Sequence, residues 1–298
     1  LPLLLVLLVT TAVYLNILQN PFVRDDWVII SQNDFALRDL SFGYMFQHSL
    51  FGVQPPGDGY FRPLTLLTFA LNFQFAQANP AGYRIVNISL HLLVVAIVFG
   101  GQNQGGRRWL YLSFALITFF IGLFAKETMV VIPVLIVMMD VVWSRFSWRR
   151  QIKENFSWYG GFVLLFWLYL WVRLGSGAPL TLEGAREMDI ISRVAFALKL
   201  LALNLGVVFY PVHLSLFRVV SLPDSPWEWQ VILGMLLVFA LLIAAYFLWR
   251  WRGIAFGLLW FLIAILPALN LTLLNYPMME HWLYLPLIGL VLVLVGSV

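Results

Sequence analysis

Two adjacent aspartates, Asp25 and Asp26, are the residues of this chain best suited to acid–base chemistry. They follow an apolar run, Leu1–Leu18, and lie in the longest polar segment, which extends from Gln19 to Arg84. Two carboxylates beside a membrane span are costly to place unless water, a cation or a substrate meets them. A carboxylate in such a position is able to accept the proton of a hydroxyl group. In a soluble loop the same pair is more often a helix cap or a solvated turn, so by itself it favours neither catalysis nor structure.

The composition places the pair in an integral membrane protein. Hydrophobic residues make up 62% of the 298 and charged residues only 11%, with a mean hydropathy of +0.89. Soluble chains are usually about a quarter charged. There is no cysteine, which excludes disulfides, thiolate metal sites and cysteine nucleophiles. No basic run interleaved with aromatic residues occurs in a hydrophilic setting, so no nucleic-acid partner is expected.

We predict an all-α, polytopic transmembrane bundle in a single domain, residues 1–298, because each apolar run is about long enough to cross a bilayer as a helix. Residues 19–84 form a large first loop, in which Leu40–Phe51 and Leu64–Phe75 are expected to be short amphipathic helices on the membrane surface. The expected spans are Leu1–Leu18, Ile85–Phe99, Trp109–Phe124, Thr128–Val142, Phe156–Leu174, Val231–Trp249, Gly253–Leu274 and the run from Leu283.

Loop charges orient these spans. Ser144–Asn155 holds four basic residues and one acid, so the positive-inside rule places it in the cytoplasm. Counting back along the chain puts Lys126-Glu127 outside, Arg107-Arg108 inside and the aspartate loop outside, which agrees with the charges of all three.

The count fails further along the chain, at Arg193–Val212. If this stretch crosses the membrane, the basic turn holding Arg250 and Arg252 falls outside. We therefore predict that the stretch is re-entrant, or split into two short helices near Asn204. Lys199, within the same stretch, is expected to extend its amine to the membrane surface.

A set of acids and bases from distant parts of the chain falls on the outer face with the two aspartates. A phosphate at this surface requires Arg or Lys, and a hydroxyl acceptor requires a carboxylate base. Simpler interpretations remain open, namely an interfacial ion pair at Lys126-Glu127, a helix cap at Glu280-His281, and interhelical polar contacts at Asn87 and His91. The outer set consists of Asp25, Asp26, Arg62, Lys126, Glu127, Glu280 and His281.

Five short stretches, in this order, resemble the GT-C glycosyltransferases, and in particular the transmembrane O-mannosyltransferases that act on cadherins and their bacterial homologues with tetratricopeptide repeats. The stretches are Phe22-Val23-Arg24-Asp25-Asp26-Trp27-Val28-Ile29-Ile30 with Asn33; Tyr60-Phe61-Arg62-Pro63-Leu64-Thr65; Gly82-Tyr83-Arg84-Ile85-Val86-Asn87 with His91; Ala125-Lys126-Glu127-Thr128 with Pro133 and Asp140; and Glu280-His281-Trp282-Leu283-Tyr284-Leu285-Pro286.

The resemblance implies a sugar donor on polyprenyl or dolichyl phosphate, membrane lipids as surroundings, and a protein or glycan acceptor outside the cytoplasm. It implies a single displacement with inversion at the sugar carbon, with no tightly bound cofactor or metal site and with divalent-metal dependence left open. The resemblance also implies a role for each residue. Asp25 is the general base, and Asp26 orients the acceptor or binds a cation. The leaving phosphate is neutralised by Arg62, Lys126 and His281, and these cations and the aspartates are supported by Glu127, Glu280, Arg84 and His91.

The chain departs from these relatives at Gly100–Arg108, where they carry another pair of spans with a polar loop. We therefore expect the pair to be absent or the sequence to be discontinuous there. The chain also begins and ends inside apolar runs, so residues are expected to be missing at both ends. His281 stands where relatives often have Arg, which makes phosphate binding there sensitive to pH.

Two other functions compete with glycosyl transfer. One is transport of a lipid-linked or anionic solute, which usually places ionisable groups near the midplane of internally repeated helices. The other is a non-catalytic subunit of a membrane assembly, for which Asp25→Asn is harmless. We expect a bacterial inner membrane with a periplasmic site, and an endoplasmic reticulum membrane with a luminal site as the alternative.

Overall fold

The computed structural model describes residues 2–32, 37–38, 40–53, 56, 58–101, 108–143, 148–179, 189–212, 214–271 and 277–296. Within these ranges the chain is helical, apart from turns, extended segments and one isolated antiparallel bridge between Arg218 and Met278. Six of the described helices are long and apolar enough to cross a membrane. The prediction of an all-α polytopic bundle is confirmed. The linker around residues 102–107, where we expected a discontinuity, lies outside the described residues.

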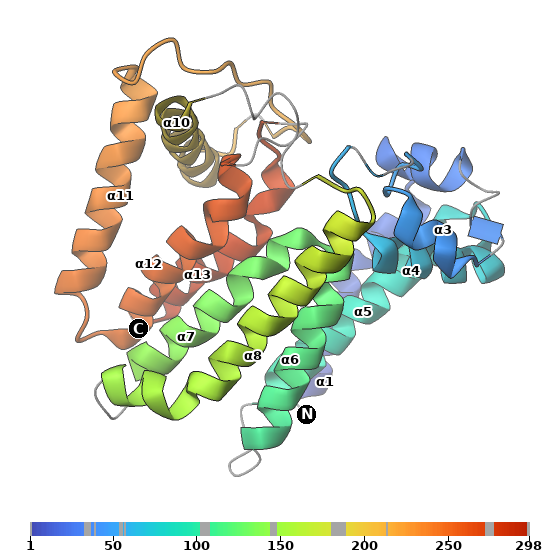
Figure 1. Ribbon diagram of the computed structural model, residues 1–298, viewed down its shortest axis with the longest axis horizontal. Helices are drawn as coiled ribbons and strands as arrows, with labels where there is room; N and C mark the ends of the chain where they lie inside the picture. Colours follow the sequence, from blue (N-terminus) through green and yellow to red (C-terminus); the bar gives the residue numbers. More distant parts are fainter. Residues whose placement is uncertain are drawn as a thin grey trace. The chain divides into compact units, whose positions relative to one another are not determined.

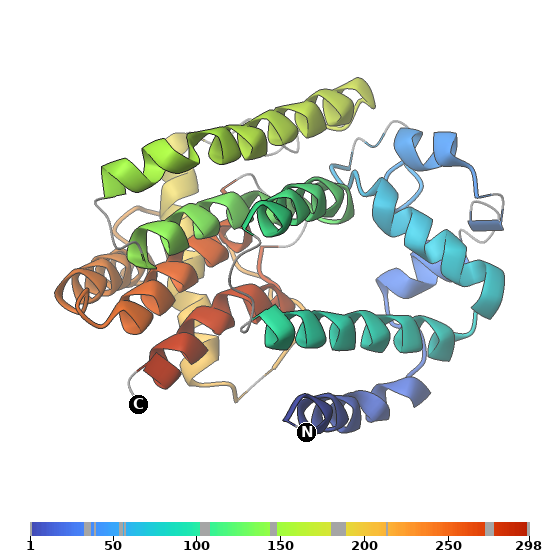
Figure 2. The same ribbon diagram turned by 90° about the horizontal axis from the view of Figure 1, so that it is seen from below.

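The chain divides into two compact units, which are described separately. The first unit comprises residues 1–127 and 165–179. In it, α1 and α5 lie side by side (Figures 1 and 2), and α4 packs against α3, α5 and α6. Its helices are α1 (Pro2–Tyr14), a 3-10 turn (Leu15–Gln19), a π-helix (Trp27–Ser31), α3 (Phe42–Gln47), α4 (Pro63–Ala76), α5 (Pro80–Gly101), α6 (Arg108–Ala125) and the C-terminal end of α8 (Trp148–Gly175).

Helix α4 anchors the polar first loop. It begins at Pro63, whose fixed φ suits the first helical position and whose missing N–H is not needed there. Leu66, Ala70 and Phe73, at helical spacing, are buried in a core that includes residues of the π-helix, of α3 and of α5. Phe75 on the opposite side is 90% exposed. The two helices expected in this loop are therefore present, but α4 is apolar on both faces rather than amphipathic.

The second unit comprises residues 128–164 and 180–298. Helices α12 and α13 form its tightest pair, because Gly257 and Gly289 face one another and a Cβ on either would lie 2.5 Å from the other's carbonyl oxygen. Its helices are most of a 3-10 turn (Glu127–Val131) that begins at the last residue of the first unit, α7 (Ile132–Trp143), the N-terminal part of α8, α10 (Ile190–Phe209), α11 (Trp229–Phe247), α12 (Arg252–Ile265), two further 3-10 turns (Leu266–Leu269 and Glu280–Leu283) and α13 (Tyr284–Gly296).

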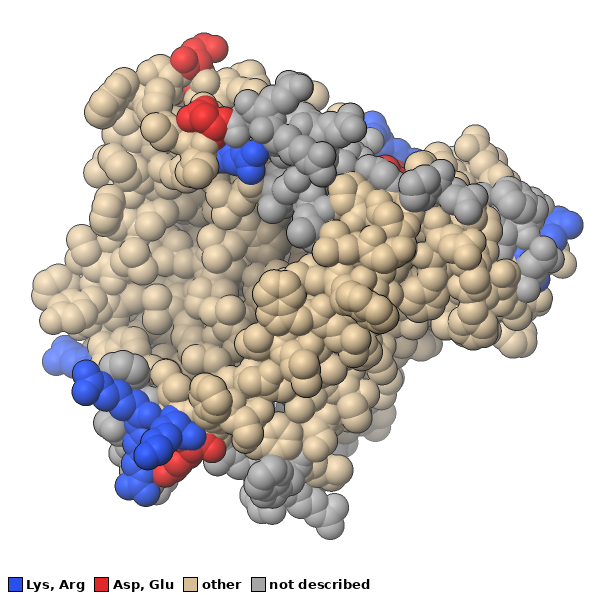
Figure 3. Space-filling model, in the orientation of Figure 1, with Lys and Arg blue, Asp and Glu red and all other residues tan. Residues whose placement is uncertain are grey.

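Exposed basic residues gather at one end of the second unit. Trp143, the last residue of α7, packs edge-on against Phe256 near the start of α12, with ring centroids 4.5 Å apart. The loops that follow α7 and precede α12 therefore lie at the same end, and Figure 3 shows Lys and Arg side chains over both. The positive-inside rule predicts that this end faces the cytoplasm. The exposed basic residues are Arg149, Arg150, Lys153, Arg250 and Arg252.

Helix α10 is continuous, so the predicted split near Asn204 is wrong. The Asn204 side chain donates to the carbonyl of Leu200 (2.8 Å) and so meets its need for a partner inside the helix. Lys199 does not reach for the surface as expected. It is buried and pairs with Glu228 at the start of α11, with Nζ 2.7 Å from Oε1.

The orientation of α10 accounts for the failed span count. Figure 1 shows α10 end-on and α11 lengthwise, whereas Figure 2 shows α10 (gold) lengthwise and α11 (orange) end-on, so the two helices cross steeply. The middle of α10 packs on the last turns of α12 and on Met278 and Leu283, opposite the basic end. A 20-residue helix is about 30 Å long, and its middle lies at this end rather than in the middle of the bundle. This geometry supports the prediction that α10 does not cross the membrane.

A reporter of membrane side inserted at Ser221, in the exposed segment between α10 and α11, is expected to give a non-cytoplasmic signal. The reason is that α10 packs across the end opposite the basic loops, so this segment is expected to lie outside. A reporter at Trp251, between α11 and α12, serves as the control and is expected to be cytoplasmic. A cytoplasmic signal at Ser221 would show that α10 crosses.

Candidate functional site

A bidentate ion pair joins the start of α4 to the chain after α6. Arg62 Nε donates to Glu127 Oε2 (3.0 Å) and Arg62 Nη2 donates to Glu127 Oε1 (2.6 Å). The Arg62 side chain is 17% exposed and that of Glu127 29%. Nearby, Thr65 Oγ1 donates to the carbonyl of Ala125 (2.8 Å), which fixes the first turn of α4 to the last turn of α6. Two distant motifs of the sequence thus meet as predicted.

Two further cations lie close to this pair. Lys126, next along the chain from α6, is half-buried, and in the described part of the chain its ammonium forms no ion pair. Arg173, in the last turn of α8, is buried and donates to Tyr169 Oη (3.1 Å) and to the carbonyls of Gly59 and Pro179 (2.8 Å each). The charge of Arg173 also acts on Glu127. Three cations therefore surround one carboxylate, which leaves an excess of positive charge.

The pKa values of the cluster follow from this balance. Burial works against the charge of Arg62, but the hydrogen bond and the negative charge of Glu127 outweigh it and raise the pKa of Arg62. Burial also works against the Glu127 carboxylate, yet Arg62 lowers the pKa of Glu127. For Lys126, burial first and the charge of Arg62 second lower the pKa, and Glu127 compensates only in part. Of the three groups, only Lys126 has its charged form disfavoured by its surroundings, and an added anion would stabilise that charge.

The two aspartates lie in the turn before the π-helix and differ in their surroundings. Asp26 pairs with Arg84 of α5 (Oδ2 to Nη2, 3.2 Å) and accepts from the backbone N–H of Val23 (3.3 Å). Arg84 Nη2 also donates to the carbonyl of Pro21, while its buried Nε has no partner among the described residues. Asp25 is exposed, and within the described chain it forms no hydrogen bond or ion pair. Asp26 therefore holds the turn in place, and Asp25 is the exposed carboxylate of the two.

The aspartates and the cation cluster occupy different parts of the first unit. In the described residues neither carboxylate forms an ion pair with Arg62, Lys126 or Arg173. Phe22, beside the aspartates, packs on Tyr83 of α5 (5.5 Å between centroids), and Tyr83 also contacts Phe69 in the middle of α4. Arg62 precedes that helix. The predicted site is thus assembled as two clusters that share α4 as their support.

The remaining predicted residues have other partners. Glu280, in the second unit, accepts from Arg218 Nη2 (2.6 Å), Arg218 Nε (2.9 Å) and the backbone N–H of Ser215 (2.9 Å). It therefore holds the segment before α11 against the chain before α13. His281 is exposed and lies in the same unit. His91 of α5 packs edge-on against Tyr14 of α1 (5.1 Å), which is an interhelical contact.

Two arginines were missed by the sequence analysis. Arg173 lies at the end of a predicted span, and a charge inside an apolar run is itself a signal of function. Arg218 lies in an extended segment with no motif around it, so nothing in the sequence distinguished it. Among the described residues, no group of three or more His, Asp or Glu side chains is placed to hold a metal ion.

The described helices define a multi-pass helical membrane protein, and its first unit carries a half-buried cluster of cations. In comparison with curated proteins, part of the chain resembles the protein O-mannosyl-transferases. It is 30% identical over 107 residues to TMTC2 of Mus musculus, 33% identical over 107 residues to TMTC2 of Homo sapiens, and 33% identical over 89 residues to Tmtc1 of Drosophila melanogaster.

These matches cover 34%, 34% and 29% of this chain and 13%, 13% and 10% of the three relatives, so the similarity is confined to a small part of their length. No family model matches the chain, and no solved structure matches it. The resemblance expected from the five motifs is confirmed by the relatives.

Proposed function

We propose that the chain is a membrane glycosyltransferase that moves a mannosyl group from a polyprenyl or dolichyl phosphate to a hydroxyl group of a protein acceptor outside the cytoplasm. The names of the relatives support mannosyl transfer to protein. The described helices support a reaction at the membrane surface. The basic end of the second unit supports an orientation in which the opposite end, with Glu280, lies outside the cytoplasm.

The observation that carries the proposal is the imbalance of charge around Glu127. A structural ion pair needs one cation, whereas Arg62, Lys126 and Arg173 are all present. A lipid phosphate adds negative charge to this cluster and relieves the repulsion between Lys126 and Arg62. Guanidinium and ammonium groups are the usual partners of phosphate oxygens. Because they are held in place before the substrate arrives, they also stabilise the charge that develops as the phosphate leaves.

The reaction is a single displacement. The acceptor oxygen forms a bond to the anomeric carbon while the bond from that carbon to the phosphate oxygen breaks. The hydroxyl proton passes to Asp25, and the lipid phosphate leaves with the bonding electron pair, held by Arg62 and Lys126. Backside attack inverts the configuration of the sugar carbon. Since no ion pair joins the two clusters, the turn with Asp25 must approach the cation cluster when substrates bind.

The test is transfer of radiolabelled mannose by the purified chain in lipid nanodiscs. The donors are dolichyl and undecaprenyl phosphate mannose, and the acceptors are peptides containing Ser and Thr and, separately, oligosaccharides. We expect labelled peptide whose sugar linkage has the anomeric configuration opposite to that of the donor. If only the oligosaccharides become labelled, the acceptor is a glycan and not a protein. Retention of configuration would exclude the single displacement, and the absence of transfer from either donor would refute the proposal.

A further inference from the structure

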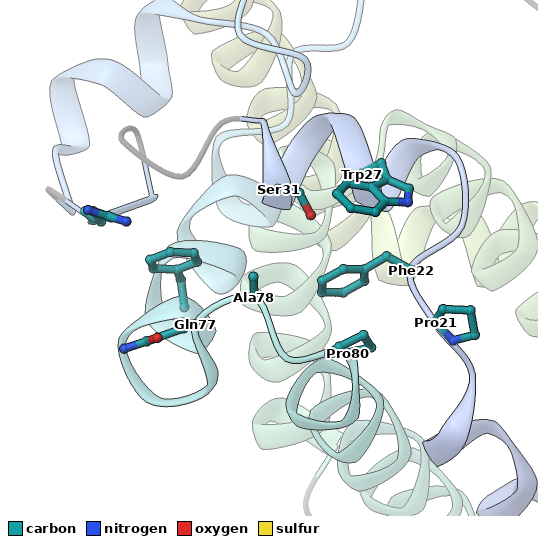
Figure 4. Close-up of a pocket in the computed structure, with 9 residues that line it drawn as sticks. Pro21, Phe22, Trp27, Ser31, Gln77, Ala78 and Pro80 are labelled. Atoms are coloured by element: carbon teal, nitrogen blue, oxygen red, sulfur yellow. The ribbon is translucent and has the colours of Figure 1, made fainter.

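A pocket of about 430 Å³ lies beside the aspartate turn, in the first unit. Its walls are contributed by the chain around the aspartates, by Arg38, and by the end of α4 with the residues that lead to α5. Phe22, Trp27 and Phe73 give it aromatic surfaces, while Ser31, Arg38 and Gln77 supply polar groups. Figure 4 shows Phe22 extending toward Ala78, with Trp27 on the same side as Phe22 and Gln77 on the opposite side. This volume is within the range of ligand-binding sites.

The backbone on both sides of the pocket has unusual conformations. Trp27 and Ser31 are the first and last residues of the π-helix, a conformation often found at functional sites, and both line the pocket. Gln77, which ends α4, has φ 47° and ψ −131°, a conformation that favours glycine. Tyr83 Oη donates to the carbonyl of Gln77 (2.9 Å) and holds it there. Such strain is typical of positions that present a side chain to a ligand.

The sugar donor cannot fill this pocket while its phosphate is bound to the cation cluster. Arg62 precedes the first residue of α4, and Gln77 follows its last. The 14 residues of this helix span about 21 Å at 1.5 Å per residue. The sugar is bonded directly to the phosphate, so the donor extends only one ring beyond it. The pocket must therefore hold something other than the transferred sugar.

The chemistry of the walls favours a peptide side chain over a saccharide. A sugar ring carries a hydroxyl on nearly every carbon, and each buried hydroxyl without a partner is unfavourable. Three polar side chains are too few for such a ring. They suit one bulky apolar side chain against aromatic surfaces, with the amide of Gln77 beside the peptide backbone.

We propose that this pocket binds a bulky apolar residue that flanks the acceptor Ser or Thr of a peptide. Phe22 and Trp27, on one side of the pocket, flank the aspartates in the sequence, so a peptide residue held against these rings has its neighbouring hydroxyl beside the aspartate turn. The assignment of the hydroxyl to Asp25 rests on the proposed function. Peptide binding does not require a catalytic role for Asp25, so the pocket proposal and the proposed function can be refuted independently.

The test compares peptides in which Ser is flanked by Leu or Phe with the same peptides flanked by Gly. Binding is measured without donor, by photo-crosslinking of a benzophenone-bearing peptide to the full chain in nanodiscs. Leu- and Phe-flanked peptides are expected to compete about tenfold or more better than Gly-flanked ones, as burial of one large apolar side chain implies. Trp27→Ala is expected to abolish this preference and to raise the acceptor KM while leaving the donor KM unchanged.

Two further variants keep the result interpretable. Gln77→Gly removes the backbone strain, so it is expected to fold at least as well as the wild type and still to bind peptide more weakly. Trp227→Ala removes another exposed tryptophan, in the second unit (80% exposed, against 58% for Trp27), and is expected to change nothing. An unchanged peptide preference in Trp27→Ala, or crosslinks to lipid that exclude the peptide, would overturn the proposal. Peptide binding with no sugar transfer would refute the proposed function, while the proposal that the pocket binds peptide would stand.

Discussion

Replacing Lys126 with methionine is expected to lower the rate of mannosyl transfer from the lipid phosphate donor by about 10²–10³-fold, the usual cost of removing one preorganised group that stabilises developing charge. Lys126 is half-buried beside Arg62 and, in the described chain, has no ion pair of its own. Methionine keeps the length and the apolar stem but removes the charge. Steady-state kinetics with varied donor are the measurement.

The stability of the same variant separates a functional lysine from a structural one. Folding lowers the pKa of Lys126, so the protonated form is less favourable in the folded chain than in the unfolded one. At neutral pH the charge therefore costs stability, and Lys126→Met is expected to melt no lower than the wild type. Glu127→Gln is the contrast. It leaves Arg62 and Arg173 without their carboxylate and is expected to lower the melting temperature. A large fall in both variants would mean that Lys126 holds the fold.

The pH profile gives an independent check on the same residue. Because the pKa of Lys126 lies below its ordinary value of 10.5, the charge is lost as the pH rises toward that value, at a lower pH than in an exposed lysine. The donor KM is therefore expected to rise at alkaline pH. In Lys126→Arg the guanidinium stays charged, so the rise is expected to disappear. The same rise in both proteins would assign the titration to another group.

Asp25→Asn is expected to reduce transfer by about 10³-fold, in the middle of the range for a general base, with little change in the donor KM. The side chain is exposed and makes no hydrogen bond or ion pair in the described structure, so the substitution is expected to leave the melting temperature unchanged. The matched control is Asp224→Asn, which alters another exposed carboxylate, in the second unit.

Asp26→Asn has a different expected result. It weakens the contact with Arg84 and the bond to the backbone of Val23, so stability falls along with activity. If Asp25→Asn transfers mannose as well as Asp224→Asn does, Asp25 is not the base. If Asp26→Asn shows the larger kinetic loss without loss of stability, the two acids have exchanged roles.

The helical fold and one of the two clusters were predictable because both leave local signals in the sequence. Apolar runs of span length predict helices whatever their packing, and the short motifs around Arg62 and Lys126-Glu127 predicted a meeting that the structure contains. Arg173 carried the signal of a charge inside an apolar run, but nothing in the sequence placed it beside Glu127. The partner of Glu280 was unpredictable, because the bridge between Arg218 and Met278 depends on how distant segments pack.

The pocket and the path of α10 show a second limit. The positive φ of Gln77 results from the way α4 meets α5, and a glutamine at that position does not predict it as a glycine would. Length and hydropathy describe α10 as a span, whereas its burial on several sides and its steep crossing of α11 describe a helix packed across one end of the second unit. Only the positive-inside count gave warning, since charge placement records topology and hydropathy does not.

The buried pair of Lys199 and Glu228 has a consequence for biosynthesis. A lysine at the centre of an isolated helix opposes membrane insertion by about 2.5–3.5 kcal/mol on insertion scales. When Lys199 leaves the ribosome, Glu228 is still 29 residues behind it in the order of synthesis. Until that carboxylate emerges, the unpaired charge of Lys199 favours a position of α10 at the surface of the bilayer. We therefore expect α10 to pack into its final position only after the start of α11 has been made.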